Sequence, residues 1–150
     1  MNLNSVATVD FSAQFGGRDA AAVVLPHFKA LKGAAKKITL NPFPYPQLAF
    51  ILRVDGDVTQ YGLSGTGNPD VDSDGKYLSI DIGITEEDRE NIPSIISSAI
   101  LDSLPIIAAA VSHRGIAGFD VNALRYPLKL LCERYIKEMN PRANLQEKDL

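Results

Sequence analysis

The chain of 150 residues has no tryptophan, one cysteine, Cys132, and only two histidines, His27 and His113. A single cysteine excludes an internal disulfide framework and fits a reducing compartment. One cysteine and two well-separated histidines do not make a zinc ligand set. Gly65-Thr-Gly67 is not followed by a lysine, so it is not a phosphate loop. We therefore expect a protein that needs no cofactor and is not an enzyme.

Signals for export or membrane insertion are also missing. The first ten residues have neither a basic nor an apolar segment of an export signal, so a cytoplasmic protein is expected. The longest apolar stretch, 92–111, has Asp102 near its centre and also contains Pro105 and several serines. A central Asp costs about 2.5–3.5 kcal/mol on insertion into a membrane. We interpret this stretch as a buried core helix and expect no contact with a membrane.

The composition is that of one globular domain. Apolar residues make up 45% of the chain and charged residues 22%, which is ordinary for a folded protein. The length allows one core and is too short for two ordinary domains. We expect a single domain over 1–150, with a flexible polar tail from about residue 141 that follows the helix-ending Asn140-Pro141.

Charge is segregated along the chain. Residues 1–54 contain six Lys/Arg and two Asp/Glu, whereas residues 55–90 contain two Lys/Arg and ten Asp/Glu. The formal net charge is only −3, so direct binding of nucleic acid is not expected. The segment 55–90, with a net charge of −8, would attract cations or basic proteins, although a merely solubilising surface has the same composition.

Two β-rich regions define the expected sheet. The apolar run 47–54, the pair Asp55-Gly56 and the run 57–62 predict a hairpin with a central first strand. Residues 63–75 are rich in turn formers and are predicted to be a loop. Strict alternation over 76–84 predicts a strand with one face on the core and one open face, to which Asp81 belongs.

Helical patterns precede and follow these strands. Pro26 either kinks a first helix or starts a second one, and this choice stays open. A main helix is expected from about 93 to 113 and a last one near 127–139. The fold class is therefore α+β, with a small, mainly antiparallel sheet of three or four strands packed against about three helices. The proline-rich segment 41–46 between helix and hairpin is predicted to be an extended connector.

An acidic loop gives the most specific local motif. Asp70, Asp72 and Asp74 alternate, Gly75 follows, and Asp81 occupies the twelfth position, which matches the spacing of an EF-hand calcium loop. No helix precedes the loop, and the residues after it form a predicted strand that would hold Asp81 in line. A calcium-binding or calcium-stabilised domain using these four aspartates is therefore retained as an alternative.

The run from Gln47 to about Ser112 resembles immunity proteins of bacterial polymorphic and contact-dependent growth inhibition toxin systems. The resemblance rests on FILRVDGDVTQYGLSG, a variable loop, YLSIDIGITEED and an apolar helix. It implies an inhibitor that binds and neutralises a cognate toxin as a hetero-complex, with a nuclease that has a basic cleft as the expected toxin. The acidic segment fits such a partner.

Eight residues are predicted to contact this partner: Asp55, Asp57, Tyr61, Asp70, Asp72, Asp74, Tyr77 and Asp81. The aspartates would complement basic residues, and the two tyrosines would serve as aromatic anchors. A third possibility is a small enzyme without a known motif, in which His27 or His113 would lie beside a carboxylate in a deep pocket.

Overall fold

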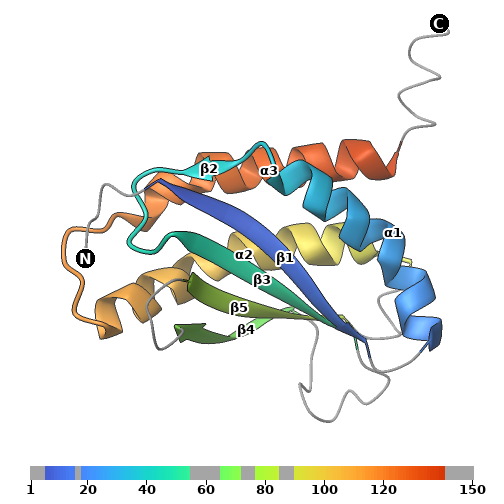
Figure 1. Ribbon diagram of the computed structural model, residues 1–150, viewed down its shortest axis with the longest axis horizontal. Coiled ribbons are helices and arrows are strands. Elements are labelled where there is room, and N and C mark those ends of the chain that lie inside the picture. Colours follow the sequence, from blue (N-terminus) through green and yellow to red (C-terminus); the bar gives the residue numbers. More distant parts are fainter. Residues whose placement is uncertain (1–5, 16–17, 55–64, 72–76, 85–89, 141–150) are drawn as a thin grey trace, which may run out of the picture.

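The computed structural model describes residues 6–15, 18–54, 65–71, 77–84 and 90–140 (Figure 1). Five strands form one mixed sheet in the order β2-β1-β3-β5-β4. The elements in chain order are β1 (Ala7–Phe15), α1 (Arg18–Ala35), β2 (Thr39–Leu40), β3 (Gln47–Val54), β4 (Gly65–Val71), β5 (Tyr77–Ile84), α2 (Ile92–His113), the short 3₁₀ helix η2 (Val121–Leu124) and α3 (Arg125–Met139).

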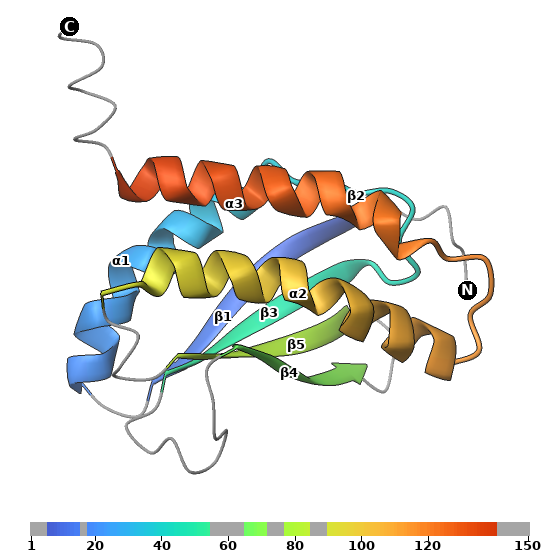
Figure 2. The same cartoon turned by 180° about the vertical axis from the view of Figure 1, so that it is seen from behind.

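Among the described residues, helices cover one face of the sheet and not the other. α2 and α3 lie across the sheet when it is viewed from behind (Figure 2), and the strands lie in front of them in the opposite view (Figure 1). α1 packs against β1 and α3 at one edge of the sheet. We call the side of the sheet that faces away from α2 and α3 the open face.

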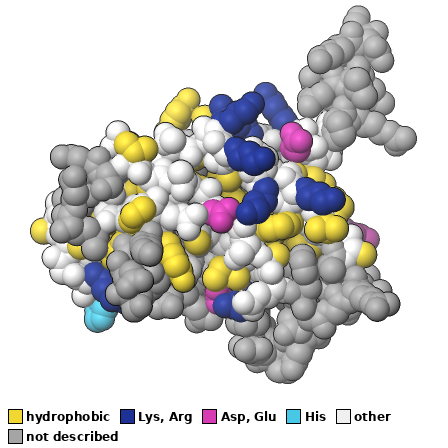
Figure 3. All heavy atoms as spheres, in the orientation of Figure 1, with side chains coloured by type: hydrophobic (Ala, Val, Ile, Leu, Met, Phe, Trp, Pro, Cys, Tyr) yellow, Lys and Arg dark blue, Asp and Glu magenta, His cyan; other side chains and the backbone are white. Residues whose placement is uncertain are grey.

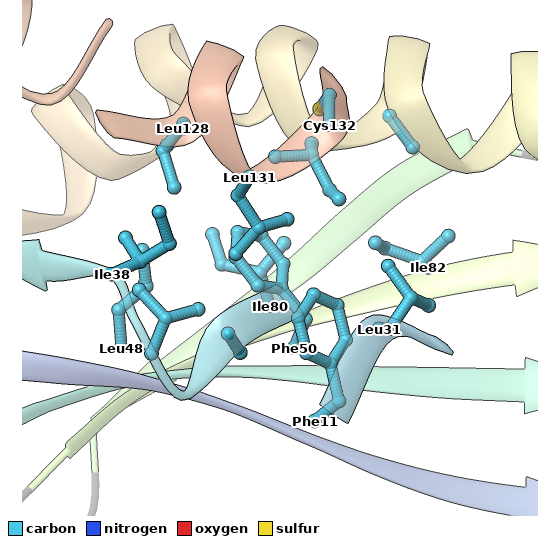
Figure 4. Packing of buried hydrophobic residues seen from close by; sticks show 14 of the residues in the cluster. Phe11, Leu31, Ile38, Leu48, Phe50, Ile80, Ile82, Leu128, Leu131 and Cys132 are labelled. Carbon is cyan, nitrogen blue, oxygen red and sulfur yellow. The ribbon is translucent and has the colours of Figure 1, made fainter. Parts of the chain in front are cut away.

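The core lies between the sheet and these helices. Leu48, Phe50 and Leu52 alternate along β3 and are fully buried. Phe50 stacks on Phe11 of β1 with ring centroids 5.4 Å apart. Figure 4 shows these rings below Leu131 of α3. The predicted central position of this strand is confirmed, although its alternate residues on the open face are only partly covered.

The α+β class and the three helices are confirmed, whereas the mainly antiparallel sheet is wrong. β3 is parallel to both β1 and β5 along its whole length, from Gln47 to Val54. Both of its edges are therefore occupied, and no hairpin partner can pair with it. The Asp-Gly pair suggested a tight turn, but pairing with distant segments determined the neighbours of β3. Residues 57–62, the expected second strand of that hairpin, lie outside the described residues.

The predicted loop 63–75 contains strand β4, which pairs antiparallel with β5. Its sequence, Gly-Thr-Gly-Asn-Pro-Asp-Val, is rich in turn formers. An edge strand forms a ladder on one side only, so it tolerates Pro69 and the register shift between Gly67 and Asp70. The hairpin of this fold therefore joins β4 to β5.

The helices follow their sequence patterns. α1 is one helix with Pro26 inside it, which settles the two alternatives left open by the sequence. α2 begins and ends close to the predicted residues and packs against β4, β5 and α3. Its Asp102 is exposed. Within the described residues, α2 is also a helix long and apolar enough to cross a membrane by length and composition.

The proline-rich connector and the last helix both attach to the core. Phe43 and Tyr45 are buried, and the Phe43 ring lies 5.9 Å from that of Phe119. The connector therefore anchors the chain on the core. In α3 the stripe of Leu128, Leu131 and Tyr135 is buried. The tail from residue 141, predicted to be flexible, lies outside the described residues.

Candidate functional site: the open face of the sheet

The open face is built from alternate residues of β1, β3 and β5. Residues that are partners in register point to the same side of a sheet. The parallel pairing therefore aligns side chains of the open face in four rows across the three strands. These rows are Thr8–Gln47–Tyr77, Asp10–Ala49–Ser79, Ser12–Ile51–Asp81 and Gln14–Arg53–Gly83.

Arg53 and Asp81 form an ion pair at one end of this face. The Arg53 Nε lies 3.0 Å from the Asp81 Oδ2, and the two side chains keep only 21% and 11% of their surface exposed. Arg53 Nη1 also donates a hydrogen bond to Gln14 Oε1. Gly83, the partner of Arg53 in register, has no side chain to block the guanidinium from reaching across to Asp81. The guanidinium is thus held in place from both neighbouring strands.

This arrangement corrects the expectation for Asp81. The residue does lie on the side of the sheet that faces away from α2 and α3, but it is buried, with 8% of its surface exposed. Ser79 and Gly83 on the same side are buried too, so the open face predicted for this strand is wrong beyond Tyr77. The charge of Asp81 is balanced by Arg53, which the sequence did not single out. One signal was present, since Arg53 is the single charged residue in the apolar run from Gln47 to Val54.

Tyr77 lies at the other end of the open face. It is the first residue of β5, its neighbour in register is Gln47, and 38% of its surface is exposed. A partly exposed tyrosine on a rigid strand is suited to act as an aromatic anchor at an interface. Its role remains a prediction, and the second predicted anchor, Tyr61, lies outside the described residues.

The predicted acidic contacts are connected to opposite ends of the strands. Asp70 belongs to β4, with its backbone opposite Ser79, whereas Asp55, Asp57, Asp72 and Asp74 lie outside the described residues. Val54 and Ile84, the residues before 55–64 and 85–89, are partners in register, whereas Tyr77, which follows 72–76, pairs with Gln47. The seven residue steps between these two pairs span about 23 Å. The acidic segments therefore join the sheet at both ends of the open face.

The geometry does not favour the calcium alternative. A calcium loop brings its carboxylates together on one ion; of the four aspartates, Asp72 and Asp74 lie outside the described residues, whereas Asp70 belongs to β4 and Asp81 to β5. The Asp81 carboxylate contacts the Arg53 guanidinium, which would repel a cation. Within the described part of the chain, no group of three or more His, Cys, Asp and Glu residues is placed to hold a metal ion.

The histidines are placed apart from the open face. His27 Nδ1 lies 2.8 Å from the hydroxyl of Tyr135, which links α1 to α3. Burial raises the pKa of the neighbouring Cys132 thiol to about 11, so this thiol is protonated and unreactive at neutral pH. His113 is exposed at the end of α2. The contact seen for His27 is thus with a phenol and stabilises helix packing.

The His27–Tyr135 contact predicts a pH dependence of stability. Burial lowers the pKa of His27 below its usual 6.5, so the unfolded chain binds this proton more readily than the folded chain. Protonation of His27 therefore leaves the free energy of unfolding unchanged above pH 6.5. It lowers this free energy as the pH falls from 6.5 towards the pKa of His27 in the folded protein. Urea denaturation at pH 7.5 and 5.5 should show a smaller decrease for His27→Gln than for the wild type. Equal decreases would contradict this prediction.

Comparison of the chain with models of protein families, with curated proteins and with solved structures gave no match.

Proposed function

We propose that the chain is a non-enzymatic binding protein, an immunity protein that neutralises a cognate bacterial toxin through an acidic surface. The observation that supports this proposal most is the placement of the segment 55–90. Its net charge is −8, and its acidic stretches join the strands of the open face at both ends. The proposal includes a cytoplasmic location, a hetero-complex with the toxin domain, and no cofactor.

The physical basis is complementarity with a basic cleft. A nuclease binds phosphates with Lys and Arg, and an inhibitor that covers this cleft must offer carboxylates in their place. Opposite charges also accelerate association by long-range steering. Between the acidic ends, the open face contributes Tyr77 and the partly covered Ile51 on rigid strands. Preorganised contact residues of this kind lower the entropic cost of binding.

Charge reversal in the 72–76 segment tests the acidic surface. We expect Asp72→Lys/Asp74→Lys to slow association with the toxin domain about tenfold or more at low salt, because steering is lost. The difference should shrink at high salt, where charges are screened. Stopped-flow or surface plasmon resonance at two salt concentrations would measure both effects.

Glu133→Lys/Glu138→Lys is the matched control, because it changes the net charge equally on exposed positions of α3, in the helical layer on the other side of the sheet (Figure 2). The expected partner is the C-terminal domain of a toxin whose gene neighbours the gene of this chain. Co-expression with that domain should protect cells, and the two chains should co-purify. Failure of both, with a folded and toxic domain, would reject the proposal.

A further inference from the structure

Helices α1 and α3 form a strongly basic surface within the described residues. Residues 20–54 contain five Lys/Arg and no Asp/Glu. Lys29, Lys36 and Lys37, on α1 and in the turn after it, are exposed. In the described part of the chain, these three lysines form no ion pair. Their charges are therefore available to a partner.

An arginine of α3 extends this surface. Arg134 Nη1 donates a hydrogen bond of 3.4 Å to the backbone carbonyl of Lys37, which holds the guanidinium beside the end of α1. A guanidinium fixed in this way keeps further N–H donors for an anion such as a phosphate. We call Lys29, Lys36, Lys37 and Arg134 the basic helix face. Figure 3 shows Lys and Arg side chains gathered over the region of α1 and α3.

The surroundings of Lys32 on α1 indicate which kind of anion this face can bind. Lys32 Nζ lies 3.0 Å from the Asp10 Oδ1, so its charge is balanced within the molecule. The same ammonium group lies 5.7 Å from the centroid of the partly buried Phe28 ring. This ring is therefore not presented for stacking with the unpaired bases of a single strand. The apolar side chains Val24 and Leu31 of α1 are buried in the core, so they cannot enter a lipid layer.

We propose that the basic helix face binds the phosphate backbone of a nucleic-acid duplex without reading its sequence. Lys29 and Lys36 are seven residues apart on α1, which corresponds to about 10.5 Å. A duplex carries one negative charge per about 1.7 Å of its axis, so several phosphates lie within reach of this face. The net charge of −3, from which no nucleic-acid binding is expected, is an average over the chain and conceals this local excess. The inference rests on the four cations and does not depend on the proposed toxin partner.

The salt dependence of duplex binding measures how many cations take part. Fluorescence anisotropy of a labelled DNA duplex of about 20 base pairs, titrated with the full chain, gives the association constant at several NaCl concentrations. Release of counterions by four cations predicts a slope of about −3.6 for the logarithm of this constant against the logarithm of the salt concentration. Binding should therefore weaken roughly 150-fold between 50 and 200 mM NaCl. A second duplex of unrelated sequence should bind within about twofold of the first.

Lys36→Gln/Lys37→Gln removes two of the four cations. The slope should change to about −1.8, and the affinity at 50 mM NaCl should fall at least about tenfold. Arg114→Gln/Arg125→Gln is the matched control, since it makes the same change in net charge at exposed positions outside the basic helix face. Its slope should stay at about −3.6. Circular dichroism checks that both variants are folded.

A wild type that does not bind the duplex at 50 mM NaCl overturns the proposal. A slope that Lys36→Gln/Lys37→Gln leaves unchanged overturns it as well. Binding only to a single strand of the same length, or only to vesicles of phosphatidylglycerol and phosphatidylcholine, overturns it in favour of another partner. Protection of cells from the toxin domain is measured separately with Lys36→Gln/Lys37→Gln, so the two proposals fail independently.

Discussion

Replacing Asp81 with alanine is expected to lower the free energy of unfolding by about 3 kcal/mol. Its carboxylate lies 3.0 Å from the Arg53 guanidinium, and both side chains are mostly buried. Removing one member of a buried ion pair leaves the other charge without compensation, which costs about 3–5 kcal/mol. The residual exposure of Arg53 sets the expected loss at the lower end of that range. Far-UV circular dichroism in urea measures it, since the chain has no tryptophan.

A double-mutant cycle separates the ion pair from other effects. Arg53→Leu alone should be similarly costly, because it leaves the Asp81 carboxylate buried. Arg53→Leu/Asp81→Ala should recover most of the loss, since no charge then remains uncompensated. Single losses below about 1 kcal/mol would show that the pair behaves like an exposed surface pair.

The same variants decide between two roles for Asp81. The sequence predicted this residue as a contact for the partner, whereas the structure assigns its carboxylate to Arg53. If Asp81 acts only through the fold, the double variant should bind the toxin domain at the wild-type rate. A slower association of this folded variant would restore Asp81 to the interface.

The hydrophobic pattern of the sequence predicted the position of those elements that are defined by the burial of their own residues. The strand 77–84, the apolar length of α2 and the buried residues of α3 lie close to the expected residues. The open face predicted for that strand is wrong, because every residue of β5 after Tyr77 is buried. The buried rings of the 41–46 connector follow from the same rule. The neighbours of β3 could not be predicted in this way, because both β1 and β5 are brought to it by tertiary packing.

In the candidate site too, only some features could be predicted from the sequence. Tyr77 lies in the predicted strand 76–84 and is partly exposed, whereas Ser79 and Asp81, which alternation places on the same face, are buried. The environment of Asp81 depends on Arg53, which precedes it by 28 residues and becomes its neighbour only through parallel pairing. The turn-like composition of 65–71 predicts a loop, but the segment forms strand β4, which its position at the edge of the sheet permits.

The largest loss of stability from a core substitution is expected for Phe50→Ala, at about 3–5 kcal/mol. Phe50 lies in the central strand, is fully buried, and stacks on Phe11 beneath Leu131 (Figure 4). Truncation removes this stacking and leaves a cavity. The strands β1 and β5 on either side of β3 prevent this cavity from collapsing. Phe50→Leu retains most of the volume and should cost about 1–1.5 kcal/mol.

Tyr126→Ala is the matched aromatic control, because this ring is 75% exposed and its loss should change stability by at most about 0.5 kcal/mol. Urea denaturation at pH 7.5 compares the three variants. Since Phe50 points away from the open face, any Phe50→Ala protein that remains folded should associate with the toxin domain at the wild-type rate. A loss below about 1.5 kcal/mol for Phe50→Ala would mean that the sheet and α3 close over the cavity. The strands would then not be as rigid as the proposed binding through the open face requires.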